Sequence, residues 1–176
     1  MTSTSGVSFS SESLFAMAST LPNVALISRN CVCDRVSNGT GYIKDYTLAQ
    51  LKKLSFNRLF PKFKDARIPT LKEVYELLKP AGLTVNVELK TGIILYPEIE
   101  EKVLALTASM GMEDRVIYSS FCHPSLVRLK ELDSGLKTGL LYSDGWIDAA
   151  AYGRHTVGAD ALHPALYHMQ DPQLIP

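Results

Sequence analysis

The sequence has no excess of charge of one sign, no long apolar run and no cysteine framework. Lysine plus arginine and aspartate plus glutamate number 18 each in 176 residues, so the formal net charge is zero. Nucleic acids and anionic membranes attract basic proteins, and the balanced composition gives no reason to expect either partner. No apolar run approaches the roughly 18 residues that a transmembrane helix needs, so no membrane span is predicted.

Cysteines are few and the start of the chain is atypical. Cys31, Cys33 and Cys122 form no Cys-x-x-Cys pair, and we predict that all three are reduced. The first twenty residues contain ten serines and threonines and no lysine or arginine. They lack the basic start and apolar middle of a signal peptide, so a cytoplasmic protein is expected. We predict a poorly specified Ser/Thr-rich start at 1–21 and one domain at 22–176.

From residue 22 onward, apolar strand patterns alternate with helical patterns. The predicted strands are 23–28, 83–89, 115–121, 136–142 and 158–163. The predicted helices are 47–54, 70–78, 96–110, 124–132 and 148–154, and Thr70 with Glu73 forms a capping box. Strands that alternate with helices indicate an α/β fold with about five parallel strands.

Several motifs occur together in one order along the chain. They are DR-x-x-NGTG at 34–41, IPTL-x-E-V at 68–74, VNVELKT at 85–91, RVIYSSFCHP at 115–124 and GADALHP at 158–164. In order and spacing the chain resembles the glycerophosphodiester phosphodiesterases over residues 24–170. The resemblance implies a TIM (β/α) barrel. It also implies hydrolysis of a small-molecule glycerophosphodiester to an alcohol and glycerol 3-phosphate, with Ca²⁺ or Mg²⁺ as cofactor.

The resemblance assigns roles to a few residues. Glu88 matches the glutamate that binds the metal in the family, and Lys90 matches a lysine near the metal that is suited to contact the phosphate. Arg29 and Asn30 stand where the family has its His-Asp pair. An arginine cannot exchange a proton near neutral pH, so the acid–base role of that histidine is lost. Arg29 is then either a phosphate contact or an uninformative replacement.

Other parts of the family pattern are missing from the sequence. No His-Arg-Gly motif is present, and no Glu-x-Asp motif follows a strand before residue 29. A closed barrel has eight strands in about 250 residues, whereas about five strands are predicted here. We therefore expect a partial barrel, incomplete at both ends. Its open sheet edges would allow two copies to associate.

The four histidines and two serines are the other side chains that could substitute for the missing groups. His163 ends a predicted strand and is a candidate to face the site. His123 precedes a proline at a helix start, which favours a capping role, and we expect His155 and His168 at the surface. Ser119 and Ser120 lack the Gly-x-Ser-x-Gly context of a nucleophile.

The turn at 34–41 is interpreted as structural. Asp34 and Arg35 lead into it, and Asn38-Gly39 is expected to supply the positive φ of a tight turn. Two functions therefore remain open for the chain. One is hydrolysis of glycerophosphodiesters, severely impaired by the lost residues. The other is a non-catalytic scaffold that binds phosphate or supports oligomers.

Overall fold

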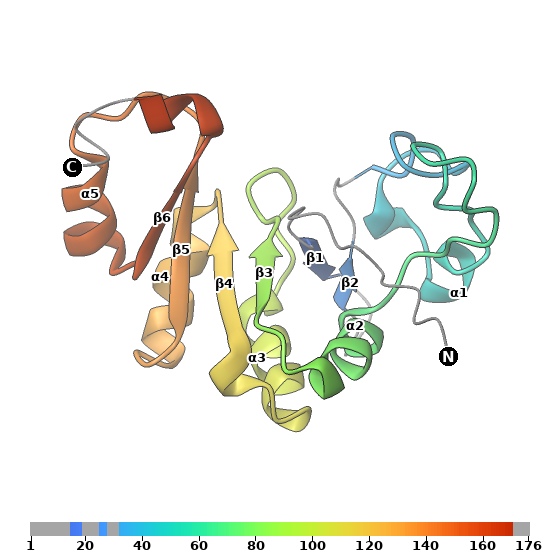
Figure 1. Ribbon diagram of the computed structural model, residues 1–176, viewed down its shortest axis with the longest axis horizontal. Helices are drawn as coiled ribbons and strands as arrows, with labels where there is room; N and C mark the ends of the chain where they lie inside the picture. Colours follow the sequence, from blue (N-terminus) through green and yellow to red (C-terminus); the bar gives the residue numbers. More distant parts are fainter. Residues whose placement is uncertain (1–14, 19–24, 28–31, 171–176) are drawn as a thin grey trace, which may run out of the picture.

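The computed structural model describes residues 15–18, 25–27 and 32–170 (Figure 1). Strands and helices follow one another in this order: β1 (Phe15–Ala18), β2 (Ala25–Ile27), α1 (Leu48–Leu51), α2 (Leu71–Leu78), β3 (Val85–Leu89), α3 (Ile99–Ser109), β4 (Val116–Ser120), α4 (His123–Leu132), β5 (Lys137–Tyr142), α5 (Ala149–Ala151) and β6 (Ala161–Pro164). A π-helical turn, Tyr152–Val157, continues α5. The alternation predicted from residue 22 onward is confirmed for β3 to β6 and the helices between them.

The strands form one sheet in the order β2-β1-β3-β4-β5-β6. Strands β3 to β6 are parallel, as predicted, and β1 pairs in parallel with β3. The prediction for 23–28 was wrong in orientation, because β2 runs antiparallel to β1. The physical reason is the connection: six residues separate these strands, whereas a crossover between parallel strands needs about a dozen. No strand was predicted at 15–18.

The sheet is open. Within the described residues, β2 and β6 each pair with a single neighbouring strand, so they form its two edges. This arrangement confirms the predicted partial barrel.

The predicted helix starts agree with the capping residues. The Thr70 hydroxyl accepts a hydrogen bond from the Glu73 backbone, and the Glu73 carboxylate accepts one from the Thr70 backbone, which completes the capping box of α2. Thr47 and Gln50 form the same arrangement at α1. Helix α3 begins three residues later than predicted, because Glu98 before it adopts a left-handed conformation, with φ of 61°.

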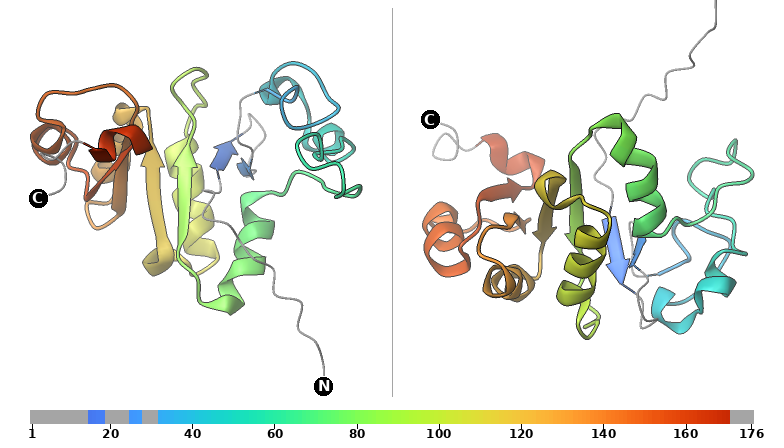
Figure 2. Two further views of the ribbon diagram at one scale, coloured as in Figure 1. Left: turned by 45° about the horizontal axis from the view of Figure 1, so that its top comes forward. Right: turned by 90° about the horizontal axis from the view of Figure 1, so that it is seen from below.

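The two faces of the sheet have different surroundings. Tyr118 of β4 donates a hydrogen bond to Thr107 of α3 at 2.8 Å, and Thr107 also contacts the hydroxyl of Tyr75 in α2 at 3.0 Å. Tyr118 therefore points to the helices, which Figure 2 shows along one side of the sheet. Because side chains alternate along a strand, Ser119 and its partner in register, Glu88, point to the opposite face.

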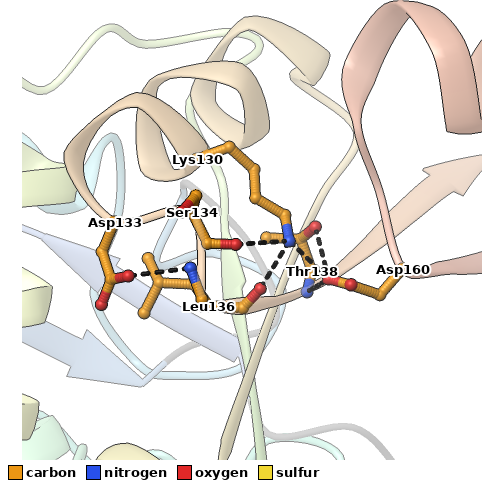
Figure 3. A network of polar contacts seen from close by, with 7 residues as sticks. Lys130, Asp133, Ser134, Leu136, Thr138 and Asp160 are labelled. Atoms are coloured by element: carbon orange, nitrogen blue, oxygen red, sulfur yellow. Dashed lines mark hydrogen bonds and ion pairs between the residues drawn. The ribbon is translucent and has the colours of Figure 1, made fainter.

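A polar network fixes the start of β6 to the turn between α4 and β5 (Figure 3). Lys130 donates to the Leu136 carbonyl at 2.7 Å and to Asp160 Oδ2 at 2.8 Å. The same carboxylate oxygen accepts the backbone N–H of Thr138 at 2.8 Å. Lys130 and Asp160 thereby join α4, β5 and β6, and neither residue lines the cavity described below.

Candidate active site

The clearest candidate site lies at the carboxyl end of β3, where Glu88 and Lys90 face each other. Glu88 is 1% exposed, and Lys90 Nζ lies 2.5 Å from its Oε1. Glu88 points to the face of the sheet opposite the helices, and the Lys90 ammonium group meets its carboxylate there. In (β/α) barrels the active site is built from the loops that follow the carboxyl ends of the strands. The end of β3 is therefore a suitable position for a ligand site.

The buried position of Glu88 changes its acidity. Desolvation raises the pKa of the Glu88 carboxyl above its ordinary value, although the hydrogen bond and the positive charge of Lys90 act in the opposite direction. Burial disfavours the charged form of a carboxylate, and a single lysine need not repay this cost. The Glu88–Lys90 pair is therefore not explained by a contribution to folding stability. Such groups cluster at functional sites, so the pair at the end of β3 is a reasonable place to expect chemistry.

Glu88 and Lys90 open into a cavity of about 490 Å³. The other residues that line it are Val32, Arg35, Tyr42, Leu89, Gly92, Ile93, Phe121 and Cys122. Its wall is mostly apolar, with a carboxylate and two cations among the lining side chains. This size and composition are typical of small-molecule sites, in which a few polar groups orient the ligand.

Arg35 reaches the cavity because the segment before α1 is folded back on itself. Val32 and Tyr42 form an isolated antiparallel bridge, and the Cys33 backbone donates to the Gly41 carbonyl at 2.9 Å. The Asp34 carboxylate accepts the Gly41 backbone N–H at 2.8 Å, which confirms a structural role for Asp34. The structural interpretation of Arg35 missed its place in the cavity. The available signal was a cationic side chain in the segment that follows the predicted strand at 23–28.

The turn itself differs from the prediction at Asn38-Gly39. The positive φ belongs to Gly41, at 77°, and not to Gly39. Gly39 is instead closely packed: a Cβ there would lie 2.5 Å from the Leu54 side chain, which would have to shift. Asn38 is structural as predicted, because its Oδ1 accepts the Ser55 backbone N–H at 2.8 Å.

The two serines at the end of β4 have different environments. The Ser120 hydroxyl donates to the Leu89 carbonyl at 2.6 Å and accepts the Cys122 backbone N–H at 2.9 Å, which is a structural role. The Ser119 hydroxyl is fully buried and has no hydrogen-bond partner within the described part of the chain. It stands next to Glu88 in register, so this face of the sheet carries a polar group that a ligand or another part of the protein can satisfy.

His163 lies on the same face of the sheet as Glu88, three strands away along the sheet order. The register Glu88–Ser119–Gly139–Ala161 runs across β3 to β6, and His163 follows Ala161 by two residues. Its ring packs over Gly139, where a Cβ would lie 2.7 Å from Nε2. Burial lowers the pKa of His163 below its ordinary value. His163 is not among the residues that line the cavity, and its assignment as a candidate remains a prediction.

Two of the other three histidines, His123 and His168, form contacts near α4 and after β6. The prediction that His123 caps a helix was wrong: it is the first residue of α4, and Cys122 occupies the N-cap position. His123 Nε2 instead lies 3.0 Å from the Leu141 carbonyl, and Nδ1 lies 3.2 Å from the Tyr152 hydroxyl. His155 is exposed as expected. His168 is partly covered and hydrogen-bonds the Ser143 carbonyl at 2.9 Å.

Three of the predicted positions lie outside the described residues: Arg29, Asn30 and Cys31. The other two cysteines, Cys33 and Cys122, are free thiols, as predicted. Burial raises the pKa of the Cys33 thiol, which keeps it in the unreactive protonated form.

The described part of the chain does not by itself provide a metal centre. It contains no group of three or more His, Cys, Asp or Glu side chains placed to hold an ion. Glu88 supplies one carboxylate, and Lys90 already engages one of its oxygens. Ca²⁺ and Mg²⁺ prefer several oxygen ligands, so these residues alone do not fit either ion.

In the part of the chain that the structure describes, no helix is long and apolar enough to cross a membrane.

Sequence comparisons identify relatives of the chain. The model of the "Glycerophosphoryl diester phosphodiesterase family" matches residues 27–175. A "Glycerophosphodiester phosphodiesterase" of Caldanaerobacter subterraneus subsp. tengcongensis is 43% identical over 143 residues, which are 81% of this chain and 58% of that protein. A protein of the same description from Bacillus altitudinis is 36% identical, over 74% of this chain and 54% of its own length. The chain spans a little over half the length of these relatives.

Solved structures share the fold. A structure described as a "Putative glycerophosphoryl diester phosphodiesterase" from Agrobacterium tumefaciens superposes with a TM-score of 0.78 at 20% identity, over 93% of this chain and 67% of that one. A phosphodiesterase from Oleispira antarctica, in complex with the product sn-glycerol-3-phosphate, superposes with a TM-score of 0.71 at 22% identity, over 92% of this chain and 68% of that one. At these identities the likeness concerns the fold.

Proposed function

Because the chain belongs to the glycerophosphoryl diester phosphodiesterase family, we propose that the cavity at the end of β3 binds the phosphate of a small-molecule glycerophosphodiester. The observation that carries the proposal is the buried Glu88–Lys90 pair, 2.5 Å apart, inside a cavity that also contains Arg35. The Oleispira antarctica structure contains sn-glycerol-3-phosphate, and this compound is therefore the first probe to use.

The chemistry of the lining groups suits a phosphate. Lys90 carries a positive charge and three N–H donors, which suit a phosphate oxygen, and it also holds Glu88. The guanidinium of Arg35 matches the geometry of two phosphate oxygens. The apolar walls, with Ile93 and Phe121, exclude water and strengthen these charge interactions. Glu88 holds Lys90 in place and lies where the alcohol or glycerol hydroxyls of a ligand would find an acceptor.

Hydrolysis of the bound diester by this chain is severely impaired in our proposal. The resemblance implies that Arg29 stands where the family has its proton-transfer histidine, and the residues that line the described cavity include no histidine. Loss of general acid–base catalysis costs about a hundred- to ten-thousand-fold in rate. No catalytic step is assigned to a metal, because Glu88 is the single described carboxylate of the cavity.

The test uses the full chain and two measurements. Calorimetric titration with sn-glycerol 3-phosphate, with and without Ca²⁺, measures binding, and release of glycerol 3-phosphate from glycerophosphocholine measures turnover. We expect saturable binding that Lys90→Met weakens by about 10- to 100-fold and that Lys72→Met on α2 leaves intact, together with turnover at least about a hundredfold below that of an intact family enzyme. Absence of binding by a folded sample would overturn the proposed ligand, and turnover at the family's level would overturn the impairment.

A non-catalytic scaffold is the second candidate, and the open sheet favours it. Among the described residues, strand β6 is an edge strand, and Leu166, two residues after it, is 85% exposed. A second copy that pairs along an open edge would cover apolar surface and complete the hydrogen bonding of the edge. Light scattering of the purified chain tests this association, and a folded monomer at micromolar concentration would contradict it.

A further inference from the structure

A loop before α2 carries exposed aromatic side chains. Between residues 58 and 65, every residue is exposed, and the three large apolar side chains Leu59, Phe60 and Phe63 are 54%, 54% and 56% exposed. Figure 1 shows this part of the chain at the edge of the molecule beside α1. We call residues 56–67 the basic loop. Three neighbouring large apolar groups in water indicate a contact surface, since monomeric proteins rarely expose them together.

The loop is built to hold these side chains outward. Its ends are joined by the hydrogen bond from the Phe56 backbone to the Ala66 carbonyl, at 2.9 Å. Within it, the backbone N–H of Phe60 bonds to Asn57 and that of Phe63 bonds to Phe60, which gives two successive turns. The rings of Phe60 and Phe63 pack edge to face, with centroids 6.5 Å apart. The apolar tip is therefore an ordered feature and not a loose tail.

Positive charge is concentrated around the same tip. Residues 56–67 contain four lysines and arginines and one aspartate, an excess of three positive charges in a chain whose net charge is zero. Lys62 and Lys64 flank Phe63, and Lys62 Nζ lies 5.0 Å from the centre of its ring. The zero net charge of the whole chain thus conceals a strongly basic region, and the composition alone gave no reason to expect an anionic partner.

We propose that the basic loop docks on the surface of an anionic phospholipid bilayer, with Leu59, Phe60 and Phe63 entering the headgroup region and the lysines contacting lipid phosphates. Apolar side chains surrounded by lysines are the composition of interfacial membrane contacts. A single-stranded nucleic acid also combines with aromatic and basic groups, but it requires open ring faces for stacking. Here one side chain of the tip is a leucine, and the two phenylalanines already contact each other.

The basic loop is connected by hydrogen bonds to the segment that lines the cavity at the end of β3. Arg58 of the loop bonds through Nη1 to the Asp34 carbonyl at 2.5 Å, and its backbone N–H bonds to Val36 at 3.3 Å. Arg35, between these two positions, lines the cavity. Contact with a bilayer would therefore place the cavity close to the membrane surface, where phosphodiester headgroups and their breakdown products are concentrated.

Vesicle co-sedimentation of the full chain tests the proposal. With vesicles of 70% phosphatidylcholine and 30% phosphatidylglycerol, we expect binding that decreases as salt is added and that pure phosphatidylcholine vesicles do not support. The double variant Phe60→Ser/Phe63→Ser should lose binding. The double variant Lys62→Gln/Lys64→Gln should weaken it by about fivefold for each lysine removed. Matched controls are Leu77→Ser, at a side chain 67% exposed on α2, and Lys72→Gln.

Specific outcomes would overturn the proposal. Equal sedimentation of the wild type and Phe60→Ser/Phe63→Ser would exclude the aromatic tip as the contact. If the chain does not bind anionic vesicles but binds a single-stranded oligonucleotide through the same residues, the loop is a nucleic-acid contact. If instead the wild type is an oligomer that Phe60→Ser/Phe63→Ser converts to monomers, while vesicles are not bound, the loop is a protein interface.

Discussion

Two carboxylate–lysine pairs in this molecule have the same chemistry and opposite acid–base behaviour. Glu88 and Lys90 lie 2.5 Å apart at the end of β3, and Asp160 and Lys130 lie 2.8 Å apart before β6. Burial tends to raise the pKa of both carboxyls. At Glu88 the effect of burial is larger than that of Lys90, so the pKa is raised above its ordinary value. At Asp160 the hydrogen bonds from Lys130 and from the Thr138 backbone outweigh burial and hold the pKa below its ordinary value.

The difference lies in how completely each carboxylate is stabilised. Asp160 Oδ2 accepts Lys130, the Thr138 backbone N–H and, at 3.3 Å, the Thr138 hydroxyl, and the side chain is 39% exposed to water. Glu88 is 1% exposed and accepts Lys90. Asp160 therefore serves the fold. Glu88 is held in an environment that is unfavourable for its charge, which is the arrangement expected where a ligand is to be bound.

Removal of each lysine in turn should separate the two roles most strongly. Lys90→Met should weaken binding of sn-glycerol 3-phosphate by about 10- to 100-fold, because a charge-assisted hydrogen bond contributes about 1.5–3 kcal/mol. Lys130→Met should leave that affinity unchanged, since Lys130 is bonded to Asp160 and the Leu136 carbonyl instead of lining the cavity. Titration calorimetry measures both constants. Equal losses in the two variants would contradict the assignment of the cavity.

The packing of the His163 ring over Gly139, on the face of the sheet that carries Glu88, offers a test of stability. Gly139→Ala should lower the free energy of unfolding by about 1–3 kcal/mol, because the new methyl group would meet the His163 ring. Gly92→Ala is the matched control, since nothing lies within 4 Å of a Cβ at that position. Urea denaturation of both variants gives the comparison. An unchanged midpoint for Gly139→Ala would show that the ring does not occupy this space.

Lys130→Met should also have a modest effect on stability. Its ammonium group is 18% exposed and joins three elements, but Asp160 stays accessible to water and keeps the Thr138 hydrogen bonds. We expect a loss of about 1 kcal/mol in the free energy of unfolding, near the upper end for partly exposed ion pairs. Thermal unfolding at low and high salt measures it. A stability equal to that of the wild type at both ionic strengths would show that the pair contributes nothing.

The sequence predicted the fold where local signals are strong. The near-continuous apolar runs at 83–89 and 115–121 became buried parallel strands, and Thr70 with Glu73 formed its capping box. The antiparallel β1–β2 pair could not be predicted, because the residues before 22 carry no clear strand pattern and pairing is a non-local property. The position of Gly39 shows the same limit: its close packing comes from the Leu54 side chain, fifteen residues away.

The site was predicted in part. Glu88 and Lys90 were found through their motif and their place at a strand end, and the structure brings them together in one cavity. Arg35 was missed because it is adjacent to Asp34, whose contact with Gly41 is structural, while its own side chain turns to the cavity. The opposite pKa shifts of Glu88 and Asp160 could not be read from the sequence, since they depend on burial and on donors from other elements.

The pH dependence of stability tests the contrast between the two carboxylates most directly. The measurement is the free energy of unfolding of the wild type, Glu88→Gln and Asp160→Asn between about pH 3 and 7. The pKa of Glu88 is raised in the folded state. Relative to Glu88→Gln, the wild type should therefore lose stability as the pH rises above the ordinary glutamate value of about 4.3.

The pKa of Asp160 is lowered in the folded state, so its contribution should have the opposite sign. It should be fully present above the ordinary aspartate value of about 3.9 and be lost as the pH falls through the lower folded value. Opposite slopes for the two differences are the result that we predict. Slopes of the same sign would contradict the account, because Glu88 would then be a structural carboxylate like Asp160.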